Sequence, residues 1–210
     1  MGCSGAPMRV PEAARATPGW AVEGYRERAD RDHDFQLGGS SVHHLRRSKP
    51  PAKLAARTIE PSAPIARSYQ FDLSTGGSTL LADCAELSEP SQASGAQVVG
   101  FGGSHHKLEC VCREGALLRV ELQLVDGVGT VALGAPAVRY RVTPARERAD
   151  GKQSSEAIGY VFTNETGTGA LERTGRGRAW PPVGLEPRAS EQLRCAYAAL
   201  FLYRPTAGGR

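Results

Sequence analysis

The chain is poor in lysine, in aromatic residues and in long apolar runs. Only four of its 26 basic residues are lysine, at positions 49, 53, 107 and 152, so arginine supplies most of the positive charge. Together with many alanine, glycine and proline residues, this imbalance is typical of a GC-rich coding sequence. The net charge of +4 is too small to indicate a polyanion-binding protein. We therefore expect a bacterial protein and do not expect it to bind nucleic acid.

No apolar run approaches the roughly 20 residues that a membrane-spanning helix needs, since the most apolar stretch covers only residues 195–203. No apolar leader segment is visible near Met1. The start Met-Gly-Cys-Ser-Gly nevertheless resembles the mature end of a bacterial lipoprotein. If translation begins upstream, Cys3 is the candidate lipidation site and the protein belongs to the cell envelope. Otherwise we expect a cytoplasmic protein.

Residues 1–64 contain few apolar residues and show no sustained period. Such a segment buries too little surface to offset chain entropy, so we expect a disordered or loosely ordered tail, with a short helix around residues 20–31 at most. Within it, residues 43–57 carry five positive charges and no acid. A solvated basic linker is the first interpretation, and contact with a membrane surface or an acidic partner is the alternative.

From Ala66 onward, short alternating runs predict antiparallel strands. The hairpin signal Asp126-Gly127 favours a two-residue turn, which pairs Val125 with Val128. The same register sets Leu122 opposite Val131, so apolar residues face one another on both strands. This agreement predicts an antiparallel meander with one buried face and one solvated face.

A C-terminal helix is predicted over residues 187–203. Pro187 suits the first helical turn, and apolar residues follow the helical repeat on nearly all sides. A helix of this kind is normally enclosed by protein. The predicted fold is therefore mainly β (α+β). It consists of a meander or barrel-like antiparallel sheet over residues 65–205, with one helix that caps or fills it.

The cysteines after the predicted tail are Cys84, Cys110, Cys112 and Cys195. Cys110 and Cys112 share one face of a predicted strand with His106, and three ligands along one straight strand do not converge on a tetrahedral ion. We therefore predict no metal site. Small buried thiols are the first interpretation, while a disulfide from Cys110 or Cys112 to Cys84 or Cys195 stays open for an exported protein.

No set of acid, base and nucleophile converges in the regular part of the sequence. Ser40, Ser41, His43 and Asp34 lie in the predicted tail, where a catalytic triad would lack a scaffold. The glycine-rich segments GFGG and TGTG do not connect a strand to a helix in a βαβ unit, so no nucleotide cofactor is expected.

The leading functional hypothesis is a non-enzymatic binding or structural module associated with the cell envelope. The alternative is a small-ligand or lipid carrier, or an enzyme, with its pocket inside the sheet. The candidate ligand-binding residues for that alternative are His106, Tyr140, Tyr160 and Trp180, with Arg139 as a further candidate.

The order of elements resembles the tubby, LURP-one and scramblase-like proteins, in which a hydrophobic C-terminal helix runs through a closed β-barrel. The resemblance rests on the strands from Ala66 onward, on GYVFTNETGTGALERTGRGRAW and on EQLRCAYAALFLY, and covers about two-thirds of the chain. Eight to ten strands are clear in the sequence, against the usual twelve of that family. The resemblance implies phosphoinositide or lipid-associated binding without catalysis, but no lipid-binding residues of the family can be matched here.

Overall fold

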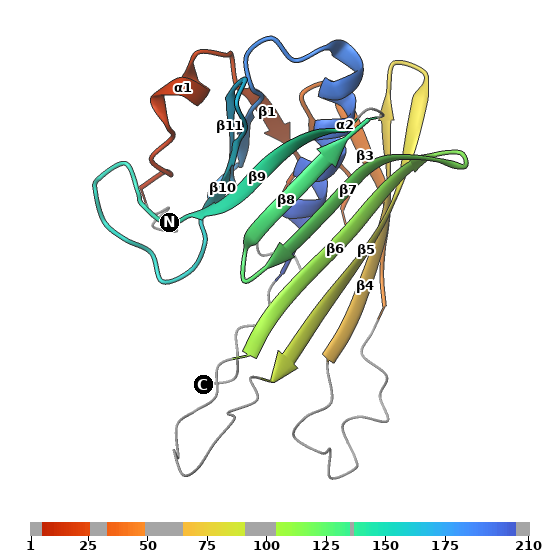
Figure 1. Cartoon of the computed structure of the whole chain (residues 1–210), viewed down its shortest axis with the longest axis horizontal. Coiled ribbons are helices and arrows are strands. Elements are labelled where there is room, and N and C mark those ends of the chain that lie inside the picture. The colour runs from red at the N-terminus through yellow and green to blue at the C-terminus, as the bar shows by residue number, and fades with distance from the viewer. Residues whose placement is uncertain (1–5, 26–32, 49–64, 91–103, 135–136, 205–210) are drawn as a thin grey trace.

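A computed structural model describes residues 6–25, 33–48, 65–90, 104–134 and 137–204. In these residues, twelve antiparallel strands form a closed barrel around one long helix (Figure 1). Neighbours in sequence are neighbours in the sheet, and β1 closes the barrel by pairing with both β2 and β12. The fold is therefore mainly β with one C-terminal helix, as predicted.

The elements follow one another along the chain with short connections at several of the hairpins. They are α1 (Glu12–Arg15), β1 (Trp20–Glu23), β2 (Phe35–Leu37), β3 (Ser40–Arg47), β4 (Ile65–Thr75), β5 (Ser78–Pro90), β6 (Ser104–Glu114), β7 (Leu117–Val125), β8 (Val128–Leu133), β9 (Val138–Ala145), β10 (Gly159–Thr163), β11 (Thr168–Glu172), β12 (Arg178–Trp180) and α2 (Pro187–Leu202). The longest strands, β4 to β6, extend well beyond the others at the lower end of the barrel in Figure 1.

The β7–β8 hairpin has the predicted register. Val125 pairs with Val128 and Leu122 with Val131. Asp126 and Gly127 both adopt positive φ, at 52° and 82°, which is the backbone geometry that a two-residue turn of this type requires. Strands β6 to β9 form the predicted four-stranded meander.

Helix α2 runs through the barrel (Figure 1). Its apolar side chains pack against the inward-facing residues of the strands. Every residue from Cys195 to Leu202 is buried. The helix covers almost the full range predicted from the sequence, and its apolar character on all sides is explained because the barrel wall surrounds it.

The N-terminal region differs from the prediction, because β1, β2 and β3 fall within residues 1–64 and complete the barrel. Residues 20–23 form a strand instead of the expected helix. β1 and β2 have only four and three residues, too few to show a clear period, and their pairing with distant strands leaves little local pattern. Residues 1–5, 26–32 and 49–64 lie outside the described residues, and so do Cys3 and most of the basic segment 43–57.

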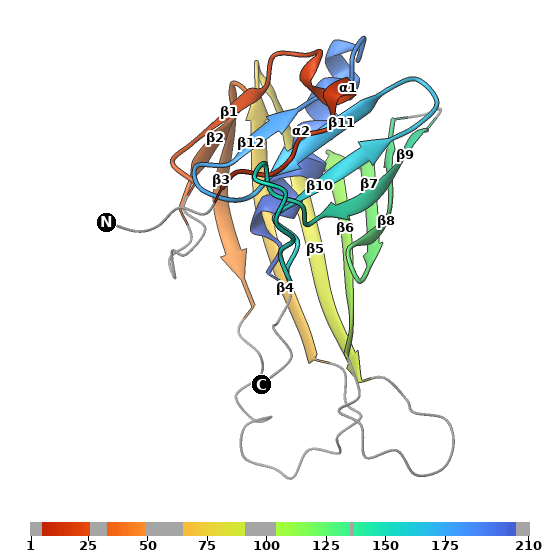
Figure 2. The same ribbon diagram turned by 90° about the vertical axis from the view of Figure 1, so that its left-hand side faces the viewer.

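The segment before β1 crosses the outside of the barrel wall, close to β10 and β11 (Figure 2). Met8 and Val10 pack there with Ile158 and Trp180 in a second, smaller core. The backbone N–H of Met8 donates a hydrogen bond to Glu172 Oε1 at 2.7 Å. The first described residues are thus part of the folded domain.

None of the helices in the described residues has the length and apolarity needed to span a membrane.

Candidate functional site

The interior of the barrel is closely packed around α2. Tyr69 is only 1% exposed, and its hydroxyl group donates a hydrogen bond to the carbonyl oxygen of Ala199 at 2.8 Å. Tyr197 donates from the helix to the carbonyl oxygen of Trp180 at 3.0 Å. Burial raises the pKa of both tyrosines well above the ordinary value. Both phenols therefore stay protonated and act as structural donors.

The structure does not bring the predicted ligand-binding residues into one site. Tyr140 and Tyr160 are buried, but the Tyr140 hydroxyl lies near Asn164, whereas Tyr160 interacts with Arg173. His106 is half-buried on β6. Trp180 belongs to the second core, under the N-terminal segment, and Arg139 is exposed on β9.

All four cysteines outside the predicted tail are oxidised in pairs, which corrects the first interpretation of free buried thiols. Cys84 and Cys110 face one another across β5 and β6 and form a disulfide. Cys112 forms the second disulfide with Cys195 of α2. The alternation of β6 was predicted correctly, since Cys110 and Cys112 both point inward, but the spacing could not identify their partners.

A cluster of charged side chains surrounds the C-terminal end of α2. Arg47 Nη2 donates to the carbonyl oxygen of Leu202 at 3.0 Å, and Arg173 donates to the carbonyl oxygen of Tyr203. A helix ends with unpaired carbonyl groups and the negative end of its dipole, so guanidinium groups are favourable partners there. Tyr25, which donates to the carbonyl oxygen of Phe201 at 3.1 Å, completes this cap.

Glu86 is the carboxylate of this charged cluster. It is 8% exposed, and its Oε1 accepts a hydrogen bond from the backbone N–H of Arg204 at 3.1 Å. Burial raises the pKa of Glu86, while that hydrogen bond and the positive charges of Arg47, Arg67 and Arg173 oppose the increase. The arrangement can hold charge at this end of the barrel, and the described side chains that form it include no cysteine, serine or threonine.

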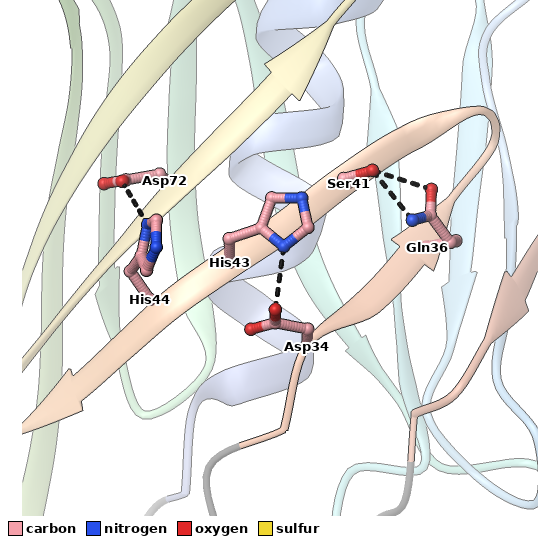
Figure 3. A network of polar contacts seen from close by, with 6 residues as sticks. All are labelled: Asp34, Gln36, Ser41, His43, His44 and Asp72. Atoms are coloured by element: carbon pink, nitrogen blue, oxygen red, sulfur yellow. Dashed lines mark hydrogen bonds and ion pairs between the residues drawn. The ribbon is translucent and has the colours of Figure 1, made fainter.

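A second polar network lies on the outer surface of β2, β3 and β4 (Figure 3). His43 Nδ1 lies 2.8 Å from Asp34 Oδ2, and His44 Nδ1 lies 2.9 Å from Asp72 Oδ2. The two imidazole rings are 6.1 Å apart between their centroids. In this arrangement the carboxylates hold the Nδ1 atoms, so Nε2 is the ring atom that each histidine can offer to another group.

A β-bulge places these consecutive histidines on one face. His43 pairs with Asp72 and Arg46 pairs with Gln70, so β3 contains one residue more than β4 over this stretch. His44 adopts a left-handed conformation with φ of 55°, which is uncommon for residues other than glycine. In a regular strand, neighbouring side chains would point to opposite faces. The bulge was not predicted from the sequence. The adjacent pair His43-His44 is visible there, but it does not by itself indicate a bulge.

Asp34, His43 and Ser41 do have a scaffold, contrary to the prediction that they lie in a tail. Ser41, however, exchanges hydrogen bonds with the side-chain amide of Gln36, at 2.7 and 3.0 Å, and not with His43 (Figure 3). The network is also exposed, with 62% of the Asp34 side chain accessible. The geometry therefore lacks the nucleophile–base contact that a catalytic triad requires.

Among the described residues, no group of three or more histidine, cysteine, aspartate or glutamate side chains is arranged to hold a metal ion. No protein-family model, curated protein or solved structure matches this chain.

Proposed function

We propose that this chain is a non-enzymatic binding or structural module that works in an oxidising compartment, such as the bacterial cell envelope. The observation that carries the proposal is the disulfide between Cys112 and Cys195, which joins the barrel wall to the helix inside it. Disulfides form and persist in oxidising compartments and are rare in the cytosol. A barrel filled by its own helix leaves the outer surface and the two ends for binding.

The alternative of a carrier or enzyme with an internal pocket would need space that α2 now occupies. Leu193, Leu200 and Phe201 fill this space and are each at most 1% exposed. Ligand binding inside the sheet would therefore require the helix to move. A screen of lipids and nucleotides by thermal shift tests this alternative, because a ligand that binds the folded state must raise the melting temperature.

The resemblance to tubby, LURP-one and scramblase-like proteins supports the non-enzymatic proposal. Twelve strands around an enclosed C-terminal helix are the architecture that this resemblance implies. The hydrogen bonds from Arg47 and Arg173 to the last carbonyl groups of α2 serve the fold itself, as a helix cap.

Thiol trapping in the native organism tests the compartment. Cells are quenched with acid and alkylated before and after reduction, and the masses of peptides containing Cys84, Cys110, Cys112 and Cys195 are compared. We expect both disulfides, recovery of the protein in the envelope fraction, and a lipid adduct on Cys3 when the gene is expressed from an upstream start. Recovery of four alkylated thiols in a cytoplasmic fraction would reject the proposal.

A further inference from the structure

Two buried N–H groups near the C-terminal end of α2 have no hydrogen-bond partner among the residues that the structure describes. They are the Nε–H groups of Arg67 and Arg173. Most buried donors in proteins are satisfied by protein groups or by ordered water, so unpaired donors on charged side chains mark a place where a further acceptor can bind. The Nε–H group of Arg194 is also buried without a partner among the described residues. Arg194 stacks on the Trp20 ring at 4.7 Å and does not belong to the charged cluster around Glu86.

Arg67 and Arg173 belong to the same charged cluster. Arg67 in β4 is the direct cross-strand partner of Glu86 in β5. Arg173, which follows β11, lies close enough for its positive charge to act on the same carboxylate. It also donates a hydrogen bond to the carbonyl oxygen of Tyr203, the residue before Arg204. The backbone N–H of Arg204 in turn contacts Glu86. The two arginines thus approach one region of the barrel end from opposite parts of the chain.

Capping of the helix does not account for these donors. Arg47 and Arg173 use Nη atoms for the carbonyl groups of residues 202 and 203, and Arg67 donates to neither. Arg47, Arg67 and Arg173 act on the Glu86 carboxylate, and Asp126 acts on the neighbouring Tyr203, so guanidinium groups outnumber carboxylates in this part of the described chain. Partial burial of unpaired positive charge is costly, and an anion between the guanidinium groups would remove this cost.

We propose that Arg67 and Arg173 bind one small tetrahedral oxyanion, phosphate or sulfate, at the end of the barrel where α2 ends. Each guanidinium can present Nε–H and one Nη–H to two oxygens of the same anion, a geometry that lysine does not offer. The unpaired Nε atoms are buried. This burial favours a free ion over a phosphate held at a bilayer surface.

The affinity for the anion is measured by isothermal titration calorimetry on the oxidised full-length chain. Sodium phosphate and sodium sulfate are titrated at constant ionic strength, with sodium chloride as the reference anion. We expect saturable binding of one oxyanion per chain. Arg67→Gln should weaken it about tenfold or more, as expected for the loss of hydrogen bonds to a charged group.

Arg139→Gln is the matched control, since it removes one exposed arginine on β9 and should leave the affinity unchanged. Arg67→Lys keeps the charge but loses the guanidinium fork, and it should bind the anion more weakly than the wild type. This second variant replaces Arg67→Gln if circular dichroism shows that the glutamine variant does not fold.

Vesicles distinguish the two sources of phosphate. Sedimentation with vesicles of phosphatidylcholine, with and without phosphatidic acid, is compared in the presence of free phosphate. Binding to phosphatidic acid vesicles without calorimetric binding of free phosphate would overturn the proposal in favour of a lipid headgroup. Equal affinity in the wild type, Arg67→Gln and Arg67→Lys, or no saturable binding at all, would also overturn it.

Discussion

Cys112 in β6 and Cys195 in α2 form a disulfide that joins the barrel wall to the helix inside it. The other disulfide, between Cys84 and Cys110, joins two strands that are already paired. The two bonds therefore constrain the unfolded chain to different degrees, because they close loops with sequence separations of 83 and 26 residues.

The disulfide of the helix should contribute more to stability. From these loop lengths, chain entropy predicts about 4.5 kcal/mol for Cys112–Cys195 and about 3.5 kcal/mol for Cys84–Cys110. We expect the variant with Cys112→Ser and Cys195→Ser to unfold at lower urea concentration than the variant with Cys84→Ser and Cys110→Ser. Equilibrium unfolding followed by tryptophan fluorescence measures both, and the reverse order would contradict the loop-length argument.

Tyr69→Phe should lower the free energy of unfolding by about 0.5–1.5 kcal/mol, because the buried carbonyl group of Ala199 loses one of its two donors and keeps the backbone N–H of Tyr203. Tyr25→Phe is the comparison, since its hydroxyl bonds the carbonyl oxygen of Phe201 in a partly buried position that water can reach. Urea unfolding of both variants gives the difference. Equal losses would show that burial of the bond has no influence here.

Gly38→Ala should be more harmful than Gly39→Ala. Both glycines have positive φ, 56° and 83°, so alanine at either position costs about 1–2 kcal/mol in backbone energy. A Cβ at position 38 would also lie 2.6 Å from the Trp20 ring, whereas nothing lies within 4 Å at position 39. Melting temperatures of the two variants provide the measurement, and a smaller decrease for Gly38→Ala would contradict the contact with Trp20.

Glu86→Gln should change how stability depends on pH. Burial raises the pKa of Glu86 in the folded state, so between its unfolded and folded pKa the folded protein binds more protons. The contribution of Glu86 to stability is therefore highest below the unfolded pKa, and it decreases as pH rises through the folded value.

We expect Glu86→Gln to flatten the pH profile in that window, because glutamine does not ionise. Urea unfolding at a series of pH values measures this effect, with Glu165→Gln on an exposed turn as the control. A profile of Glu86→Gln that parallels the wild type would show that Glu86 does not contribute to the slope.

Features that depend on nearby residues could be predicted from the sequence. The Asp126-Gly127 turn, the alternation of Cys110 and Cys112, and the apolar helix over residues 187–203 each leave a pattern within a few residues. The sequence could not predict whether the candidate ligand-binding residues form one site. The alternation of a strand predicts which face a side chain lies on, but it does not predict which residues lie opposite it across the barrel.

By itself, then, the sequence determined the antiparallel meander and the enclosed helix, since hydrophobic periodicity and turn chemistry are local properties of the chain. Only the tertiary structure decided which cysteines pair, that β1 to β3 complete the barrel, and that Arg67 and Arg173 both act on Glu86. Each of these features joins segments far apart in the chain. Their proximity comes from closure of the sheet around α2, which no short stretch of residues encodes.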